Sequence, residues 1–543
     1  MDIGEARPPG YRIRRWRSIA GWSCAGLLLY AAYLQISLSG RIDSDGANSA
    51  LQAWDLIHGH LLLHGWLFGD ATYYSFELPI IGITELIFGF GPLAAHIASA
   101  LVYFIVTACS VALAVGGSRG AARVARGAAT VTVLAVPLLT MFAVWTLVEE
   151  PDHPGTSVFM LVPALLLDRL PYARRRPPGG WIPSVICVVL AAGQLGDATV
   201  TYVAVPAITV ACAYRVRASR RLRSADGAVL LAAITSVPLS ILLQALMTWM
   251  GGYQVVPPRT QFAPPGQWLG HVEIVWSDLR ALYGAAGGPG TALGAAGAAL
   301  GLICLLAAMA GLGKVAWTWR RATRAEHVLV GVIVLNFALY VVSRAPLPEG
   351  SRELAAMLPC GAVLAARALI PGQLTRRAFA LAAVAMTGLL ALVPLAVAAA
   401  RPQVGPATGP APSNGGSAQT APLTTWLERH GVTYGIGGYW DASVVTLQSG
   451  GRVEIRTIDL AQKPNGAGWR SYVRAWETNA LWYDPSRHDA RWAIARLRGP
   501  YSVRTYESLF GKPEAMYRVD SWVVLEYRVN LLREIGPVLA PAG

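Results

Sequence analysis

Charged residues are scarce in this sequence, and lysine is almost absent. Asp, Glu, Lys and Arg together make up 14% of the 543 residues, against 54% hydrophobic residues. Lysine occurs only at Lys314, Lys463 and Lys512. Because a soluble domain carries about 25% charged residues, this composition excludes a soluble protein of this length.

Cysteine is also scarce, and every cysteine lies within an apolar segment. The six positions are Cys24, Cys109, Cys187, Cys212, Cys304 and Cys360. Their placement indicates neither a disulfide framework nor a thiolate metal site. We therefore expect these side chains to pack among hydrophobic neighbours.

Hydrophobic runs, in contrast, recur through the first 400 residues. Eleven of them approach the length of roughly 20 residues that a helix needs to cross a bilayer: 19–38, 93–115, 128–148, 156–170, 181–196, 199–213, 228–250, 291–313, 327–343, 353–370 and 378–400. The first run has no small-residue cleavage pattern before Arg41, so we expect it to remain as a span. The sequence therefore predicts an all-α polytopic membrane protein with about 11 transmembrane helices.

The formal net charge of +14 comes from arginines grouped between the apolar runs. The basic loops are 118–127, 168–180, 214–227, 314–326 and 371–377, and the alternate loops are acidic. The positive-inside rule explains this segregation without a polyanionic partner, so we expect no nucleic acid to bind. We predict a cytoplasmic amino terminus and an extracytoplasmic carboxyl-terminal region in a plasma membrane.

The chain divides into a membrane part at 1–400, a linker at 401–422 and an outer domain at 423–543. The linker is too rich in Pro, Gly, Ser and Ala to form a core. Alternating helix and strand patterns in the last segment predict a small extracytoplasmic α/β domain. Its expected helices are 424–429, 442–448 and 531–535, and its expected strands are 432–436, 453–458, 492–495 and 522–527.

The outer loop at 40–91 begins with two aspartates, Asp43 and Asp45. Charge at membrane depth points to a functional role. An amphipathic helix follows them, and the apolar segment 78–91 is too short to span, so we expect an interfacial or re-entrant helix there. A structural alternative for the aspartates remains, because Asp45 is placed to cap a helix that begins at Ala47.

Several stretches resemble a known superfamily. An acidic outer loop after the first span is followed by LIHGHLLLHG, by LPIIGITELIFGFGPLAAHIASALVYFIVTACSVALAV, by QLGDATVTYVAVPAI and by GSRELAAMLPCGAVLAARAL. This pattern resembles the GT-C membrane glycosyltransferases, in particular the protein O-mannosyltransferases and aminoarabinose transferases. The similarity covers roughly the first 370 residues as a pattern of spans.

The resemblance implies an inverting glycosyltransferase with a lipid-linked donor. Such an enzyme moves a sugar from a polyprenyl-phosphate carrier to a glycan, lipid or protein of the cell envelope, at the outer face of a bacterial plasma membrane. The chain lacks a glycine-rich phosphate loop, which argues against direct use of a nucleotide sugar. Abundant Arg, Ala and Gly beside rare Lys are typical of a GC-rich genome, and we expect an actinobacterial source.

The same resemblance implies roles for charged residues. A carboxylate at the membrane surface can take the acceptor's proton, and the family pattern calls for one acid where this chain has Asp43 and Asp45. A second acidic site is expected among Glu149, Glu150 and Asp152, which are otherwise ordinary acids at a span end. The departing lipid phosphate needs cations, and the candidates on the outer face are Arg344, Arg352 and Arg259. Nearby glutamates and lipid headgroups are their alternative partners.

No cofactor is expected, and a metal site is not indicated. The spacing of His58, His60 and His64 is similar to that of metal ligands, but only His60 and His64 share a helix face, so at most two ligands converge. Asp197 lies in a tight hairpin and is expected to cap a helix or a turn. The aromatic residues of the last domain are expected mainly in its core, with sugar stacking as the alternative: Tyr434, Tyr439, Trp440, Trp469, Trp476, Trp482 and Tyr483.

Two other classes of function remain open at this point. A transporter or lipid flippase would place polar groups along several span interiors, whereas here the charges gather at one face. A non-catalytic envelope-assembly protein would keep the same fold and use the outer domain for binding. Replacement of the loop acids separates these classes from an enzyme.

Overall fold

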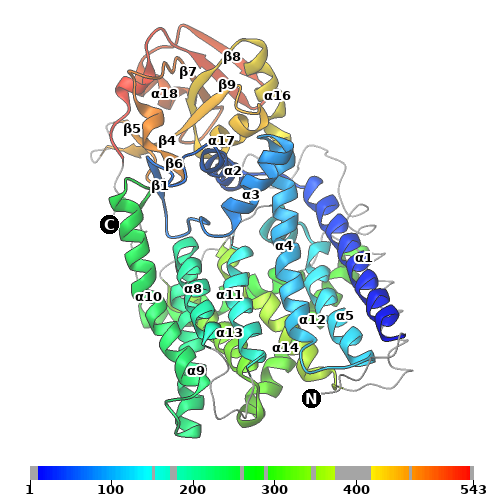
Figure 1. Ribbon diagram of the computed structural model, residues 1–543. Helices are drawn as coiled ribbons and strands as arrows, with labels where there is room; N and C mark the ends of the chain where they lie inside the picture. Colours follow the sequence, from blue (N-terminus) through cyan, green and yellow to red (C-terminus); the bar gives the residue numbers. More distant parts are fainter. Residues whose placement is uncertain are drawn as a thin grey trace.

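The computed structural model describes residues 10–149, 153–170, 180–256, 262–286, 292–343, 350–372, 417–463 and 468–538. A bundle of helices carries a sheet-containing domain at one end (Figure 1). We call this end of the bundle the domain end and the opposite one the arginine end, after the half-buried Arg126 and the buried Arg324 and Arg367. The chain is a membrane protein, because six of its described helices are long and apolar enough to cross a bilayer.

The six long apolar stretches are Ala20–Leu38 in α1 (Gly10–Leu38), Pro92–Ala114 in α4, Ala121–Leu139 in α5 (Ala121–Ala135) and the turn after it, Ala225–Trp249 in α10, Gly294–Trp317 in α12 (Ala292–Trp317), and Arg324–Val342 in α13. Shorter helices complete the bundle: α7 (Val158–Asp168), α8 (Trp181–Gly196), α9 (Val205–Ser219), α11 (Trp268–Leu282) and α14 (Met357–Leu369). The total of about 11 spans stays a prediction.

Two predicted spans differ from the observed helices. The run 128–148 is interrupted at Thr140, whose extended backbone separates the turn Val136–Leu139 from α6 (Met141–Val144) and a π-helical turn, Trp145–Glu149. The run 353–370 is divided into a 3-10 turn, Gly350–Leu354, and α14. Local backbone breaks of this kind leave no trace in hydrophobicity. The run 378–400 lies outside the described residues.

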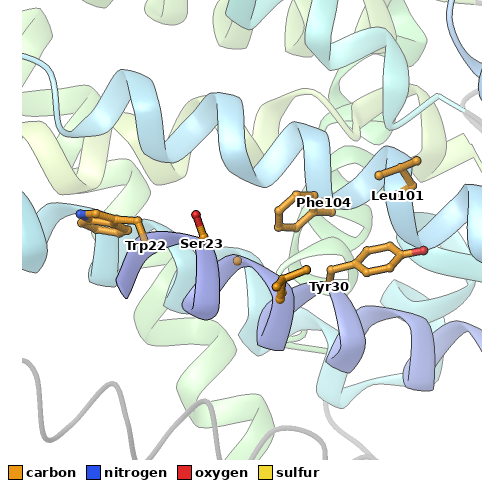
Figure 2. Close-up of a pocket in the computed structure, with 7 residues that line it drawn as sticks. Trp22, Ser23, Tyr30, Leu101 and Phe104 are labelled. Atoms are coloured by element: carbon orange, nitrogen blue, oxygen red, sulfur yellow. The ribbon is translucent and has the colours of Figure 1, made fainter. Parts of the chain in front are cut away.

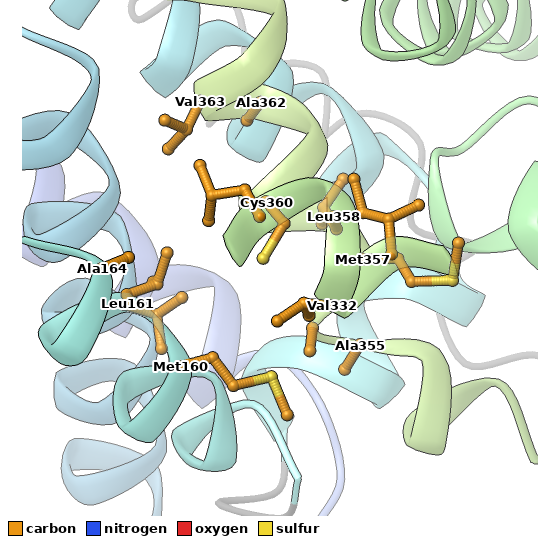
Figure 3. Packing of buried hydrophobic residues seen from close by; sticks show 14 of the residues in the cluster. Met160, Leu161, Ala164, Val332, Ala355, Met357, Leu358, Cys360, Ala362 and Val363 are labelled. Atoms are coloured by element: carbon orange, nitrogen blue, oxygen red, sulfur yellow. The ribbon is translucent and has the colours of Figure 1, made fainter. Parts of the chain in front are cut away.

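Large apolar side chains and small ones together fill the centre of the bundle. Figure 3 shows Met160 and Leu161 of α7 close to Val332 of α13 and Leu358 of α14. Cys360 is fully buried in the same cluster, as the sequence predicted, whereas Cys24 is exposed and departs from that prediction. The packing of α14 among these helices matters for the site, because the turn just before α14 carries Arg352.

The arginine end is held by buried ion pairs. Arg324 donates two hydrogen bonds to Asp226, of 2.6 and 3.1 Å, and Arg367 donates in the same forked way to Asp168. Arg126 donates to backbone carbonyls, including that of Ile370 at 2.9 Å. The guanidinium groups therefore satisfy helix-end carbonyls as well as carboxylates.

The segment 40–91 lies at the domain end and contains two helices and a short strand: α2 (Ser44–Ile57), β1 (Trp66–Phe68) and α3 (Glu77–Phe88). The helix expected within 78–91 is confirmed. Four apolar side chains of α3 are more than half exposed: Ile83, Leu86, Ile87 and Phe88. An exposed apolar helix face beside the first spans fits the boundary between water and lipid.

The C-terminal domain is built on one mixed sheet with the strand order β5-β4-β3-β7-β9-β8. Its strands are β3 (Tyr434–Gly437), β4 (Glu454–Gln462), β5 (Trp469–Val473), β7 (Trp492–Arg496), β8 (Ala515–Val519) and β9 (Trp522–Glu526), and its helices are α16 (Ser417–Arg429), α17 (Tyr439–Gln448) and α18 (Val503–Phe510). Strand β3 runs parallel to β4 and β7, and the other pairs are antiparallel.

The predicted α/β character of this domain is confirmed, with differences in detail. Strands β5 and β8 and helix α18 were not expected, and the expected final helix at 531–535 is a 3-10 turn, Leu531–Glu534. Helix α16 starts at Ser417, so the structured domain begins before the predicted end of the linker at 422. Residues 401–416 lie outside the described residues.

The C-terminal domain is attached to the 40–91 segment by a second sheet and a helix pair. Strand β1 pairs with β2 (Gln254–Val255), which follows α10, and with β6 (Thr478–Asn479) of the C-terminal domain. Helix α17 packs on α2, where Ala47 and Ala50 share a buried cluster with Val444 and Leu447. The alanines permit close approach, and α17 lies beside α2 (Figure 1). The hydrogen bond from Ser44 to the Tyr439 carbonyl places the starts of the two helices together.

Candidate active site

The two aspartates of the loop occupy the first turn of α2. Asp43 is the residue that caps this helix: its Oδ1 accepts hydrogen bonds from the backbone nitrogen atoms of Asp45, at 2.8 Å, and Gly46, at 3.4 Å. The expectation that Asp45 caps a helix beginning at Ala47 was therefore wrong, because the helix starts three residues earlier, at Ser44. Both carboxylates lie at the positive end of the helix dipole, which favours negative charge.

A single arginine connects the two acids. Arg352 donates to Asp45 Oδ2 at 2.7 Å and to Asp43 Oδ2 at 3.4 Å. Its guanidinium group lies 4.0 Å from the centre of the Trp145 ring, and Trp145 Nε1 donates to Asp43 Oδ2 at 3.4 Å. The sequence predicted Arg352 as a site residue, and the structure brings it to the acids from a distant part of the chain.

The C-terminal domain supplies the other side of this site. The phenolic oxygen of Tyr439, the first residue of α17, lies within hydrogen-bond distance of both Asp45 Oδ1 and Glu477 Oε2. Arg474 lies over the Tyr439 ring at 3.8 Å and pairs with Asp459 at 3.2 Å. Tyr439 is buried, as expected of a core residue, and it also contacts a loop acid.

Burial governs the charge states at this junction. It raises the pKa of Asp45, and the neighbouring Asp43 raises it further, although Arg352 and Tyr439 oppose the shift. Burial also raises the pKa of Tyr439 well above its usual value, and the adjacent carboxyl groups of Asp45 and Glu477 add to this. Tyr439 is therefore a neutral phenol at physiological pH, and Asp45 holds a proton more readily than an ordinary aspartate.

Of the three acids predicted to form a second acidic site, only Glu149 lies within the described residues. Its carboxylate lies against Gly40, just after α1, so closely that any side chain at Gly40 would collide with it. Its backbone carbonyl accepts a hydrogen bond from Ser99 at 3.3 Å. Glu149 thus borders the loop that carries Asp43. Glu150, Asp152, Arg344 and Arg259 lie outside the described residues, so their roles stay predictions.

Asp197 has the structural surroundings that the sequence predicted. It ends α8 and accepts hydrogen bonds from Thr156 at 2.6 Å, His153 at 3.1 Å and the backbone nitrogen of Thr199 at 2.7 Å. Burial alone would raise the pKa of Asp197, but these donors outweigh it and lower the pKa below its ordinary value. Asp197 therefore ties three segments together at the domain end.

The three histidines of the loop do not converge. His58 stacks on Trp54 with ring centroids 4.0 Å apart, and His64 makes a hydrogen bond of 2.7 Å with the carbonyl of Gly251. His60 lies 3.9 Å from Asp55. Within the described part of the chain, no three His, Cys, Asp or Glu side chains are placed to hold a metal ion.

Two grooves lie away from the acids. The larger, of about 590 Å³, is apolar and lies between α1 and α4, where Figure 2 shows Trp22, Tyr30 and Phe104 along its walls. The smaller, of about 280 Å³, is bordered by His60 and His64. Neither is lined by Asp43, Asp45 or Arg352.

Sequence reasoning missed Trp145, Glu477 and Arg474 as site residues. Trp145 sits in an apolar run and looks like an ordinary core residue, and nothing in the sequence marks it. Glu477 has one backbone signal that only a structure reveals, because its φ of 53° lies in the left-handed region. Non-glycine residues held in this region cluster at functional sites.

The sequence matches no known protein family and no curated protein. The structure is similar to ArnT from Cupriavidus metallidurans bound to undecaprenyl phosphate, with a TM-score of 0.52, 14% identity, and coverage of 96% of this chain and 99% of that chain. The apo state of the same ArnT gives a TM-score of 0.53 at 13% identity, covering 96% and 100%.

A third similar structure is the oligosaccharyltransferase of Archaeoglobus fulgidus tethered to an acceptor peptide, with a TM-score of 0.44, 14% identity, and coverage of 87% of this chain and 69% of that one. The similarity to ArnT extends over nearly all of both chains, including the C-terminal domain. The predicted fold class, a GT-C-like bundle with a C-terminal α/β domain, is therefore confirmed.

Proposed function

We propose that this protein is a membrane glycosyltransferase that moves a sugar from a polyprenyl-phosphate donor to a hydroxyl group of a cell-envelope acceptor. The observation that carries the proposal is the pair Asp43 and Asp45, joined by Arg352 at the domain end of a fold shared with ArnT. Carboxylates can accept the acceptor's proton, and an arginine can bind the lipid phosphate. The bound undecaprenyl phosphate of that ArnT structure supports the choice of donor class.

We assign the general base to Asp43. Each described partner of its carboxylate is a donor, as suits an ionised group: two backbone nitrogen atoms, Trp145 and Arg352. The contacts to Asp43 Oδ2 are both long, at 3.4 Å, so an acceptor hydroxyl can compete for this oxygen. Both Asp45 oxygens, in contrast, are engaged by close partners, Arg352 and Tyr439.

The reaction that follows is a direct displacement at the anomeric carbon. The acceptor oxygen forms a bond to this carbon while the bond to the phosphate oxygen breaks, and the hydroxyl proton passes to Asp43. Polyprenyl phosphate leaves with the electron pair, and the configuration at the anomeric carbon inverts. A cation beside the leaving phosphate stabilises its charge as that charge develops.

Arg352 can link donor binding to the release of the base. In this state the guanidinium group of Arg352 binds both acids. The phosphate of the lipid-linked sugar would compete with these acids for the same N–H groups. A phosphate on Arg352 would therefore weaken the hold on Asp43 Oδ2 and expose it to the acceptor. Arg344 and Arg259 are proposed as further phosphate ligands on the strength of the sequence alone.

The test uses envelope chemistry, because the sugar and the acceptor are still to be identified. Envelope glycans are compared by mass spectrometry among strains that carry the native chain, no chain, or the Asp43→Asn chain. We expect the Asp43→Asn strain to lack the same sugar as the deletion strain, although the variant is present in the membrane. A variant strain with the native glycan profile would contradict the enzyme and favour the assembly protein.

A second measurement on the same strains distinguishes a transferase from a transporter. An inactive transferase leaves the sugar-charged polyprenyl lipid on the side where the site lies, whereas an inactive flippase leaves it on the cytoplasmic side. We expect the charged lipid to accumulate at the outer face in the Asp43→Asn strain. Accumulation at the cytoplasmic face would overturn the proposal.

We propose that the domain end faces the cell exterior, following the segregation of arginines to the other end. In a chain without its native cysteines, a Cys in place of Ser486, which is exposed in the C-terminal domain, should react with an impermeant reagent in intact cells. A Cys in place of Ser219, exposed at the arginine end, should react only after permeabilisation. The reverse pattern would contradict this orientation.

A further inference from the structure

A hydrogen-bonded chain of three side chains, Asp45, Tyr439 and Glu477, joins the membrane part to the C-terminal domain. Tyr439 is 394 residues from Asp45 in sequence and 38 from Glu477. Its position is fixed on both sides, since Ser44 donates to the Tyr439 carbonyl at 2.5 Å and Ser443 of the same helix donates to Asn48 at 2.7 Å. The phenol is thus held rigidly beside Asp45.

The hydrogen bonds of this chain require two protons. A phenol carries one proton and can donate it to only one of the two carboxyl oxygens beside it. The other contact is satisfied only when its carboxyl group is protonated and donates to the phenolic oxygen. With both acids ionised, the phenol would donate to one carboxylate, and its oxygen would face the second carboxylate oxygen at hydrogen-bond distance with no proton between them.

Neighbouring charges also favour this extra proton. The charged groups facing the chain are Asp43 and Arg352 on the loop side, and Arg474 with its partner Asp459 on the domain side. Arg352 pairs with Asp45 at 2.7 Å and with Asp43 at 3.4 Å, and Arg474 pairs with Asp459. A fully ionised chain would therefore set four carboxylates against these two guanidinium groups.

The backbone of Glu477 gives independent support. Its φ of 53° places a non-glycine residue in the left-handed region, directly before β6, which pairs with β1 of the loop. An extended backbone would continue β6 by one residue and turn the side chain elsewhere. The pairing between domain and loop therefore holds Glu477 in the conformation that reaches Tyr439.

We propose that Tyr439 and Glu477 are positioning residues that share one additional proton with Asp45, which lowers the negative charge beside Asp43. The inference rests on the proposed function for its catalytic meaning but not for its charge state. In the resting site the proton is delocalised along Asp45, Tyr439 and Glu477. The shared proton therefore reduces the like-charge repulsion between Asp45 and Asp43.

Infrared difference spectra of the purified protein test the shared proton without any sugar transfer. At neutral pH, the native-minus-Glu477→Gln spectrum should contain the stretching band of a protonated carboxyl group, because the amide supplies the missing donor and the proton is no longer needed. Tyr439→Phe should alter the same band. The control Glu428→Gln, which changes an exposed ion pair of the same domain, should remove only a carboxylate band. A carboxylate band alone in the Glu477→Gln difference would overturn the proposal.

The pH dependence of transfer tests the positioning role. In Glu477→Gln, an ionised Asp45 would lie beside the proposed base, and the like-charge repulsion should move the acidic limb of the rate profile to higher pH while the maximal rate falls by about tenfold or less. A merely structural role would lower the rate and leave the limb in place, and that result would overturn the proposal. If the native protein transfers no sugar, the infrared result still decides the charge state, and only the proposed function fails.

Discussion

The two ends of the helix bundle both contain buried arginines and acids, but they are arranged differently. At the arginine end, Arg367 forms a forked pair with Asp168, and Asp226 forms a forked pair with Arg324 and a further contact, of 3.5 Å, with Arg215. At the domain end, Arg352 is shared by two aspartates, and a tyrosine and a glutamate adjoin them. Arginines that match or outnumber the acids neutralise charge and fix helix ends, whereas an excess of acid around one cation leaves a carboxylate available for chemistry.

The comparison predicts that substitutions at the domain end remove activity and that those at the arginine end remove stability. The largest effect is expected for Asp43→Asn. Asparagine caps a helix as well as aspartate does, so the fold should survive, but the amide cannot accept the acceptor's proton. Transfer measured with purified protein should fall by about a hundredfold to ten-thousandfold.

The matched control for this variant is Asp55→Asn on the same helix. Asp55 accepts a hydrogen bond from Trp66 at 2.8 Å, which the amide oxygen can still accept. Transfer by this variant should stay near the native rate. Equal losses in the two variants would mean that any change in α2 disables the protein, and the distinction between the ends would fail.

The next effect in size is a loss of stability in Arg367→Ala. The change leaves Asp168 without its forked partner and the Leu113 carbonyl without its 2.9 Å donor. Removal of one partner of a buried pair costs roughly 3 kcal/mol or more. The midpoint of thermal unfolding in detergent should fall clearly, while the transfer rate per folded molecule stays native.

Arg452→Ala provides the control for that measurement. Arg452 pairs with Glu428 at 2.7 Å, but its side chain is 72% exposed. Exposed pairs of this kind add little to stability, so its unfolding midpoint should match that of the native protein. A drop as large as that of Arg367→Ala would contradict the role assigned to the buried pair.

A smaller effect is expected for Arg352→Lys. Lysine keeps the charge and loses the fork that reaches Asp43 and Asp45 together and that would hold a phosphate. The KM for a polyprenyl-phosphate donor should rise about tenfold, which corresponds to roughly 1.4 kcal/mol. Arg452→Lys is the control, and a native donor KM in Arg352→Lys would argue against phosphate binding at this side chain.

The smallest effect concerns the pH dependence of stability at Asp197. Its pKa is lowered in the folded protein, so its contribution to stability is present above the ordinary aspartate range near pH 4 and is lost as the pH falls through the folded value. The native protein should therefore lose more stability than Asp197→Asn between about pH 5 and pH 2. Parallel curves for the two proteins would show that Asp197 does not contribute in this way.

Much of the membrane part could be predicted from the sequence, because helices that cross a bilayer appear as long hydrophobic runs. Local patterns predicted the acids of the 40–91 segment, the helix α3 and the α/β character of the C-terminal domain, whereas Arg352 was singled out by the family resemblance. The break at Thr140 did not, since an interrupted helix and a continuous one have the same hydrophobicity. The start of α2 was also misplaced, because Asp43 and Asp45 are both good capping residues.

The contacts of Tyr439 and Glu477 with the loop could not be predicted from the sequence, for a different reason. Its contacts join positions 394 residues apart, and they depend on the pairing of short strands β1 and β6 and on two alanines of α2. Tyrosines of small α/β domains are usually core residues, and no local pattern distinguishes Tyr439 from them. Tertiary packing alone makes it a neighbour of the loop acids.

The most direct test measures activity and stability on the same purified samples of Asp43→Asn and Arg367→Ala. Release of polyprenyl phosphate from a lipid-linked sugar donor is followed beside thermal unfolding. The predicted result is opposite behaviour: Asp43→Asn keeps the native unfolding midpoint and releases almost no lipid phosphate, while Arg367→Ala unfolds earlier and retains native release per folded molecule. Release at the native rate by Asp43→Asn would contradict the account.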